Sequence, residues 1–210
     1  MMTLYYSPNA CSRAAHIALE ETGAPYERVR VSLKDGEQHR PEFLAVNPKG
    51  KVPALKVDGR VVTECPAVLA FIAASFPEAG LSPANDPFAA ADMLAFNLYL
   101  ASTVHVSFAH DRRAARWADD EAAQAAMRAK VPQNLIEQFG TIEERLGDGR
   151  TFVHGQSYSV SDPYLFTFTG WLRERGIADE TRFPRVFAHY DRVKARPAVQ
   201  RILEIENGVA

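Results

Sequence analysis

Hydrophobic and polar positions follow two different patterns along this chain, and the change comes near residue 77. In the first part, short β-rich or alternating segments take turns with segments of helix-forming residues. Asp58-Gly59 separates two of the β-rich segments, which is typical of a hairpin. Val29 and Val31 alternate with polar residues and should share one face of a strand. The pattern predicts strands at 3–6, 27–32, 52–57 and 60–63, helices at 11–22 and 66–75, and one or two helical turns at 41–46.

The second part has the spacing of helices only. Apolar residues recur there every three or four positions, which puts them on one side of a helix. Two such stripes stand out: Leu94, Leu98, Ala101, His105 and Phe108, and then Met127, Val131, Leu135, Phe139, Ile142 and Leu146.

Other residues mark where these helices begin, bend or end. Pro132 lies inside the second stripe and should bend or interrupt its helix. Ser159 and Asp162 have the spacing of a capping box, with Ser159 as N-cap. We expect a helix to start there and two shorter ones to follow near 184–194 and 198–206.

A segment rich in Pro, Gly, Ser and Ala separates the two patterns. We therefore expect an α/β domain over residues 1–77, a linker over 78–87, and an all-helical domain over 88–210. The α/β unit has the order β-α-β, a loop, and β-β-α, which predicts a small mixed sheet.

Composition and charge exclude several classes of partner. The net charge of −2 and the pI near 6.3 predict no basic face, so we expect neither nucleic acid nor an acidic membrane as a partner. No run of 18 apolar residues predicts a membrane span, and the N-terminus lacks the pattern of a secretory signal. Two cysteines in 210 residues fit a reducing compartment, and we expect the cytoplasm.

Cys11 is the residue whose position most suggests chemistry. It follows a predicted strand and turn and begins a helix, where orphan N–H groups and the helix dipole favour an anion. That position predicts a lowered thiol pKa. A buried cysteine acting as a small hydrophobe is an equally good interpretation. The sequence Cys11-Ser12-Arg13-Ala14 has no second cysteine, so a dithiol redox cycle is excluded.

Two further segments have ends that could receive a ligand. Val52-Pro53 stands at the head of a predicted strand. X–Pro bonds are usually trans, but a cis bond there would turn the Val52 N–H and C=O outward, free to pair with an extended peptide. Glu64-Cys65-Pro66 begins a helix, where N–H groups can hold a carboxylate and Glu64 an ammonium group. An exposed Glu beside an ordinary helix start explains this second segment as well.

His105 lies on an apolar stripe, where a histidine is more often a core residue than a catalyst. No group of His, Cys, Asp and Glu has metal-ligand spacing, and we expect no metal.

Together these segments resemble the cytosolic glutathione transferases, most closely the bacterial beta class, over nearly the whole chain. The opening residues 4–12 with Cys11 are similar to the beta-class active-site segment, and residues 46–55 to the segment that ends in the family's cis-Pro. Three stretches and one pair of residues carry the rest of the resemblance. The stretches are Thr63 to Ala67, Ser102 to His105, and Ser159 to Asp162, and the pair is Cys11 with His105.

The resemblance implies a thioredoxin-like N-terminal domain, an all-helical C-terminal domain and a homodimer. It also implies glutathione as the co-substrate, with Cys11 beside its sulfur and His105 brought toward it. The implied glutathione-binding residues are Lys34 for the glycine carboxylate, Val52 and Pro53 for the backbone, Glu64 and Cys65 for the γ-glutamyl group, and Ser102.

The chain departs from the family pattern at three places. Cys65 stands where the family usually has Ser, and a thiol is a poorer hydrogen-bond donor than a hydroxyl. Val106 stands where the beta class has Lys. Leu98 occupies the place of a glutathione-contacting Asn, which here falls one residue earlier as Asn97.

We therefore expect a glutathione transferase that activates the glutathione thiol for attack on a small hydrophobic electrophile between the domains. Hydrogen bonds from Cys11, Ser12 or His105 would assist. Two alternatives remain open. In one, Cys11 forms a mixed disulfide, as in a thiol transferase or peroxide reductase. In the other, the protein binds ligands without turnover. The identity of the electrophile would depend on side chains near Phe108, His110, Arg112, Arg113 and Trp117.

Overall fold

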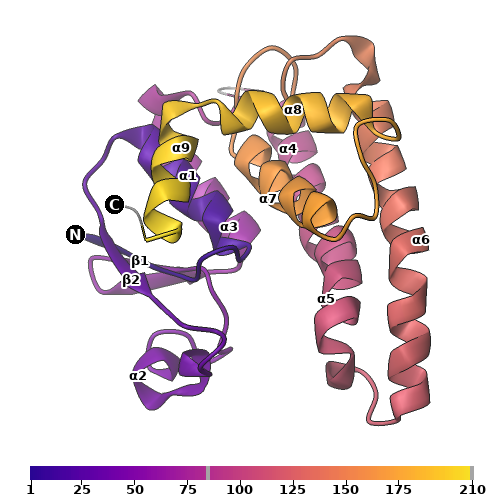
Figure 1. The fold of residues 1–210 in the computed structure, drawn as a ribbon. Coiled ribbons are helices and arrows are strands. Elements are labelled where there is room, and N and C mark those ends of the chain that lie inside the picture. Colours follow the sequence, from indigo (N-terminus) through magenta and orange to yellow (C-terminus); the bar gives the residue numbers. More distant parts are fainter. Residues whose placement is uncertain (84–85, 209–210) are drawn as a thin grey trace.

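A computed structural model describes residues 1–83 and 86–208, and in it a small sheet with its helices adjoins a larger group of helices (Figure 1). The sheet has the order β2-β1-β3-β4; β1 pairs with β2 in parallel and with β3 antiparallel, and β3 pairs antiparallel with β4. The predicted mixed sheet is confirmed. Its elements are β1 (Met2–Tyr6), α1 (Ser12–Thr22), β2 (Glu27–Arg30), α2 (Pro41–Leu44), β3 (Ala54–Val57), β4 (Arg60–Thr63) and α3 (Cys65–Ser75).

The predicted hairpin joins β3 to β4. Val57 pairs with Arg60 across the two-residue turn, in which Asp58 and Gly59 both have positive φ angles of 47° and 84°. These angles suit the twist of the two strands, and Asp-Gly adopts them at low cost.

One face of the sheet is buried under α1 and α3. Leu4 and Leu55 pair side by side in the sheet and are fully buried with side chains of both helices. The strand predicted over 27–32 ends earlier, since β2 stops at Arg30, and Val29 and Val31 differ in burial. Val31, just beyond the end of β2, is buried, whereas Val29 is exposed on a strand that pairs only with β1.

In the second part of the chain, the described residues form helices joined by loops. Its long elements are α4 (Pro87–Tyr99), a π-helical turn (Leu100–Val104), α5 (His105–Arg113), α6 (Glu121–Arg145), α7 (Ser161–Glu174), α8 (Pro184–Lys194) and α9 (Pro197–Glu206). Helix α7 is the central one, since eleven of its fourteen residues are buried. Helix α1 packs against α7 and α9 and so joins the two parts (Figure 1).

The expected linker over 78–87 is held against the helical part. Leu81 is buried, and its carbonyl accepts a hydrogen bond from the Val160 N–H at 2.9 Å. Helix α4 begins at Pro87, one residue before the expected boundary. Residues 84 and 85 of this linker lie outside the described residues.

The first predicted stripe is only partly right about burial. Leu94 and Leu98 are exposed, and α4 instead buries Met93, Phe96 and Asn97. A periodic pattern identifies residues that share a side of a helix, but not which side another element covers.

Pro132 does not interrupt its helix, and the expectation that it might is wrong on this point. Helix α6 runs unbroken for 25 residues through it. Because proline has no N–H, the carbonyl of Arg128, four residues earlier, lacks its usual helical hydrogen bond. Both residues are exposed, so water can bond to that carbonyl instead.

The predicted contacts between Ser159 and Asp162 are present, but the expectation that Ser159 is the N-cap is wrong, because α7 begins at Ser161 and Val160 is its N-cap. The Asp162 carboxylate accepts from the Ser159 N–H at 2.7 Å and from the Ser159 hydroxyl at 3.0 Å. The Ser159 hydroxyl in turn accepts from the Ser161 N–H at 3.3 Å, where the regular helix begins.

Candidate functional site

A cleft of about 640 Å³ lies between the sheet part and the helical part, with α5 along one side. It is lined by residues from the two parts, and seven of the eight candidate site residues are among them. These seven are Cys11, Lys34, Val52, Pro53, Glu64, Cys65 and His105.

Cys11 lies at the N-cap of α1, directly after the turn that follows β1. Its side chain is buried, and its thiol donates to the Val52 carbonyl oxygen at 3.5 Å. Burial raises the pKa of the Cys11 thiol to about 11, although the positive charge of Arg113 and nearby backbone N–H groups act in the opposite direction. The expected lowering of this pKa is wrong, because loss of hydration outweighs the helix start.

The turn before Cys11 is held by residues far away in the sequence. The Asn9 N–H donates to Glu206 on α9 at 3.0 Å, and the Trp171 indole on α7 donates to the Asn9 carbonyl at 3.0 Å. Glu206 is buried and also pairs with Arg13 at 2.8 Å. The helical part therefore fixes the position of Cys11. Neither Trp171 nor Glu206 was among the predicted site residues, because no pattern near them in the sequence indicates this contact.

Ser12 does not present its hydroxyl to the cleft. It is fully buried, accepts from the Ser7 N–H at 3.1 Å and donates to the Ser7 carbonyl at 3.2 Å. The expectation that it could help to activate a thiol is therefore not supported, since its hydroxyl is used to close the turn.

Val52 and Pro53 form the edge of the cleft where β3 begins. Their peptide bond is cis. The ladder between β1 and β3 ends at the Tyr5–Ala54 pair, so the Val52 backbone lies beyond it. Asn47 braces the preceding loop, donating to the Lys51 carbonyl at 2.6 Å and accepting from the Lys49 N–H at 3.2 Å. At Val52, this segment thus presents backbone to the cleft that is not paired with a neighbouring strand.

Glu64 and Cys65 stand at the start of α3. Glu64 is the N-cap and has a φ of 70°, a conformation that L-residues rarely adopt and that is often associated with functional sites. Its carboxylate pairs with Lys49 at the surface. Cys65 is the first helical residue, with its N–H among the orphan donors of the helix start.

The Cys65 side chain is already engaged by another residue of the cleft. It is buried, and its thiol donates to the Cys11 carbonyl oxygen at 3.5 Å. Burial and the neighbouring Cys11 raise the pKa of Cys65 well above its usual range. Cys65 therefore offers its backbone N–H, and not its thiol, to a ligand.

His105 begins α5, directly after the π-helical turn at Leu100–Val104. Its ring lies 5.4 Å from the rings of both Phe168 and Trp171 on α7. Burial lowers the pKa of His105 to about 4, and the positive charges of Arg113 and Lys51 act in the same direction. His105 is therefore neutral at pH 7 and faces the cleft as a hydrogen-bonding group without charge.

Ser102 is the one candidate that the structure leaves outside the cleft. It is exposed, and its hydroxyl donates to the Leu98 carbonyl of its own helix at 2.8 Å. Lys34 lies on an exposed loop at the edge of the cleft. Three further lining residues that the sequence analysis did not select are Tyr164, Trp171 and Arg175.

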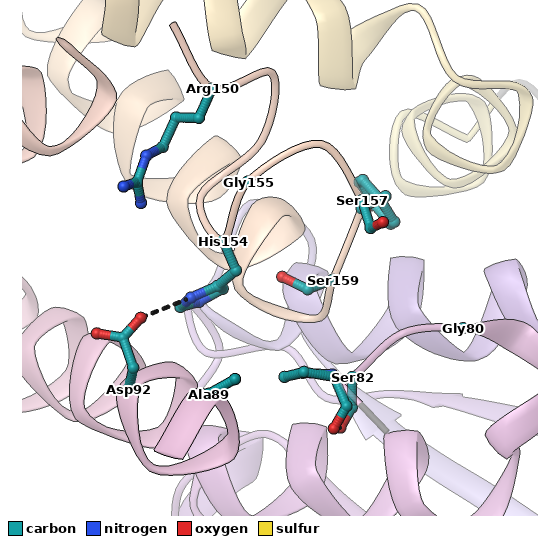
Figure 2. Close-up of a pocket in the computed structure, with 11 residues that line it drawn as sticks. Gly80, Ser82, Ala89, Asp92, Arg150, His154, Gly155, Ser157 and Ser159 are labelled. Atoms are coloured by element: carbon teal, nitrogen blue, oxygen red, sulfur yellow. Dashed lines mark hydrogen bonds and ion pairs between the residues drawn. The ribbon is translucent and has the colours of Figure 1, made fainter. Parts of the chain in front are cut away.

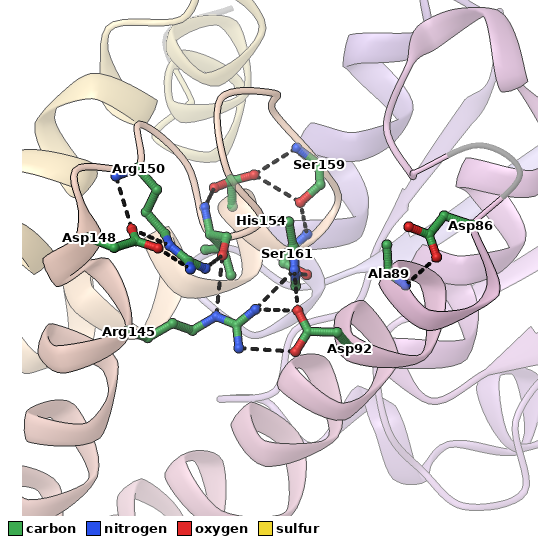
Figure 3. Close-up of polar contacts among 11 residues, drawn as sticks. Asp86, Ala89, Asp92, Arg145, Asp148, Arg150, His154, Ser159 and Ser161 are labelled. Carbon is green, nitrogen blue, oxygen red and sulfur yellow. Dashed lines mark hydrogen bonds and ion pairs between the residues drawn. The ribbon is translucent and has the colours of Figure 1, made fainter.

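A second cavity, of about 490 Å³, lies where the loop before α7 meets α4 (Figure 2). In it, His154 bonds to Asp92 of α4 at 3.0 Å and to the Ser161 hydroxyl at 2.9 Å, an arrangement of Ser, His and Asp. Arg145 also binds Asp92 (Figure 3). The Ser161 hydroxyl is not accessible, because Ser161 is fully buried in the first turn of α7. The network therefore joins α4, α6 and α7 and is structural.

The described residues contain no group of three or more His, Cys, Asp and Glu that could hold a metal ion. Within the same ranges, 1–83 and 86–208, no helix is both long and apolar enough to cross a membrane.

Comparison with known proteins gives matches to two family models. Residues 1–74 match the glutathione S-transferase N-terminal domain, and residues 115–192 match the glutathione S-transferase C-terminal domain. Among curated proteins, glutathione S-transferase GstA of Escherichia coli O157:H7 is 32% identical over 207 residues, which is 98% of each chain.

Solved structures agree with this match over the full length. A glutathione transferase homolog from Sulfitobacter, solved with bound glutathione, has a TM-score of 0.91 and 39% identity, covering 100% of this chain and 99% of its own. A bacterial beta class glutathione S-transferase from Sphingomonas chungbukensis has a TM-score of 0.84 and 33% identity, covering 99% and 100%.

Proposed function

This chain belongs to the glutathione S-transferase family, and on that premise we propose that it binds glutathione in the cleft and activates its thiol for attack on a small electrophile. The fold is that of the family, a thioredoxin-like domain followed by a helical domain. The observation that carries the proposal is the convergence of three segment ends on one cleft: the start of α1, the start of β3 and the start of α3.

Each segment end offers a group that suits one part of a γ-glutamyl tripeptide. The Val52 backbone, beyond the sheet ladder, suits pairing with an extended peptide. The N–H groups at the start of α3 suit the γ-glutamyl carboxylate, and Glu64 suits its ammonium group. Lys34 at the cleft edge suits the glycine carboxylate.

The thiol of bound glutathione would lie beside Cys11. Cys11 is neutral at pH 7 and can donate a hydrogen bond to a thiolate. The sulfur of the ligand would then replace the Val52 carbonyl oxygen as the acceptor of this bond. The start of α1 and the positive charge of Arg113 favour the anion at the same place. The thiolate sulfur then attacks the electrophile, and the thiol proton passes to solvent.

A covalent role for Cys11 and a purely binding role for the protein are not favoured. With a pKa of about 11, only about one Cys11 side chain in ten thousand is a thiolate at pH 7. The attacking sulfur in this proposal belongs to glutathione.

The test is steady-state conjugation of glutathione to 1-chloro-2,4-dinitrobenzene by the wild type and Cys11→Ala. Removing one hydrogen bond from the weak S–H donor to the thiolate, worth about 1.5 kcal/mol, should lower kcat/KM by about tenfold. Loss of all catalysis in Cys11→Ala, with glutathione binding retained, would show that Cys11 itself is the nucleophile. Wild type without any conjugation would refute the proposal as a whole.

We also propose that the protein acts as a homodimer. Helix α4 exposes Phe88 by 85%, Leu94 by 47% and Leu98 by 48% in the single chain, and nothing among the described residues covers them. An exposed apolar group of this kind on one helix is typical of an interface.

The cytoplasm is the location that we propose. Both cysteines are free thiols, which suits a reducing compartment where glutathione is kept reduced. Recovery of the native protein in the periplasmic or membrane fraction of its host would contradict this.

A further inference from the structure

The cleft is strongly basic although the chain as a whole carries a net charge of −2. Among its lining residues, the only carboxylate is Glu64, which pairs with Lys49. Seven lining side chains are cationic: Arg30, Lys34, Lys51, Arg112, Arg113, Arg116 and Arg175. A cleft lined by one sign of charge concentrates ligands of the opposite sign.

Glutathione does not account for all of this charge. Its two carboxylates, in the proposed pose, lie along the sheet part, where Lys34 and the start of α3 face them. Arg175 of the helical part is already engaged, since it pairs with Asp111 at 3.0 Å and lies over the Phe108 ring at 4.8 Å. Five cations are left: Arg30 and Lys51 on the sheet part, and three at the end of α5 and in the turn that follows it.

These three, Arg112, Arg113 and Arg116, form what we call the arginine cluster. None of them has an ion pair or a side-chain hydrogen bond within the described part of the chain. Burial lowers the pKa of Arg113, and the charges of Arg116 and Arg112 lower it further, so these two charges repel the Arg113 guanidinium. All three residues are exposed and within reach of a ligand. An anion between them would relieve that repulsion.

The arginine cluster faces the reacting end of the cleft. The charge of Arg113 acts on the Cys11 thiol, and the charges of Arg113 and Arg116 act on His105. Cys11 and His105 mark the place where the glutathione sulfur would lie. An anionic group held by the cluster would therefore belong to the molecule that the sulfur attacks.

Aromatic side chains accompany the cluster. Trp117 stands against His110 with ring centroids 4.4 Å apart and remains 47% exposed. Phe108 and Trp171 line the same end of the cleft, with ring centroids 5.4 Å apart. The site thus combines an aromatic surface with planar guanidinium groups, which bind carboxylates in a bidentate manner.

We propose that the electrophile of this enzyme is an aromatic organic anion, whose carboxylate binds the arginine cluster while its ring lies against the exposed Trp117. This inference rests on the proposed function. For a chloroarene, the thiolate sulfur forms a bond to the ring carbon, chloride leaves with the bonding electron pair, and the thiol proton goes to solvent.

The test compares two electrophiles that differ in one charge, 4-chloro-3,5-dinitrobenzoate and its neutral amide, 4-chloro-3,5-dinitrobenzamide. The kcat/KM of each with glutathione is divided by its spontaneous rate constant, which removes the difference in intrinsic reactivity. We expect the wild type to favour the benzoate by about tenfold, the effect of roughly one charge-assisted hydrogen bond. The preference should shrink as ionic strength rises.

Variants then assign the preference to residues. Arg113→Gln and Arg116→Gln should each lower the benzoate-to-amide ratio by about threefold or more, and Arg113→Lys should restore part of it. The matched control is Arg60→Gln, which removes one exposed arginine of β4 outside the cleft and should leave the ratio unchanged.

Three results would overturn the proposal. The first is a wild type that handles both compounds equally or favours the amide. The second is a benzoate-to-amide ratio that stays unchanged in both glutamine variants while their KM for glutathione rises. That result would mean that the arginine cluster binds glutathione instead. The third is absence of catalysis with either compound; that result refutes the proposed function itself, whereas the first two leave it standing.

Discussion

Cys11 and His105 face the same cleft, and burial holds each of them in its neutral form. The Cys11 pKa is raised to about 11 and the His105 pKa is lowered to about 4. A neutral thiol and a neutral imidazole can both donate a hydrogen bond to a bound anion without neutralising it. The cationic groups that favour the thiolate are instead the start of α1 and Arg113.

The imidazole of His105 should stay neutral across the physiological range. Its NMR titration, assigned by comparison with His105→Gln, should show a pKa of about 4 and no change between pH 8 and pH 6. Because the unfolded chain takes up this proton near pH 6.5 and the folded chain does not, folding stability should fall as the pH drops from about 6.5 to about 4. A titration centred near 6.5 would contradict the burial of this ring.

Among the elements, the start of α7 holds a buried polar network. The Asp162 carboxylate is fully buried and accepts from the Val153 N–H at 2.9 Å and from the Ser159 N–H at 2.7 Å. It also bonds to His189 of α8 at 2.8 Å. Helix α7 carries Trp171 and Tyr164 into the cleft, so its position determines that of the site.

Two aspartate caps allow a matched test of this network. Asp162→Ala removes a buried carboxylate with several donors and should lower the free energy of unfolding by about 3–5 kcal/mol. Asp120→Ala removes the exposed N-cap of α6, which accepts one bond from the Ala123 N–H, and should cost about 1 kcal/mol. Urea unfolding of both variants checks the difference. If both variants lost the same free energy of unfolding, burial of the Asp162 network would contribute nothing to stability beyond an exposed cap.

Local sequence signals predicted most elements for physical reasons that act over a few residues. The Asp58-Gly59 turn and the Ser159–Asp162 contacts are set by short-range geometry, and both are present. The thiol pKa of Cys11 and the exposure of Leu94 depend on what packs against them from elsewhere. The site also depends on distant residues. Glu206 and Trp171 contact the Asn9 turn from about 160 to 200 residues away, and no local sequence pattern predicts these contacts.

At the scale of the whole molecule, the exposed apolar side of α4 predicts a second copy of the chain as its partner. Replacing Leu94 and Leu98 together by Arg puts two like charges on each partner at the proposed interface. The dimer dissociation constant should rise by at least about a hundredfold, measured by light scattering after size-exclusion chromatography. The matched control is Val29→Arg, an exposed apolar residue on β2. A wild type that is monomeric at micromolar concentration would contradict the dimer.

The most direct test of the proposed function is the pKa of the thiol in the complex with glutathione. It is measured from the ultraviolet absorbance of the thiolate as the pH is raised, for the wild type and for Cys11→Ala. Glutathione should introduce a thiolate that titrates clearly below the ordinary thiol pKa of about 8.5 in both proteins, because the low-pKa sulfur is that of glutathione. A low-pKa thiolate that is present without glutathione and disappears in Cys11→Ala would contradict this.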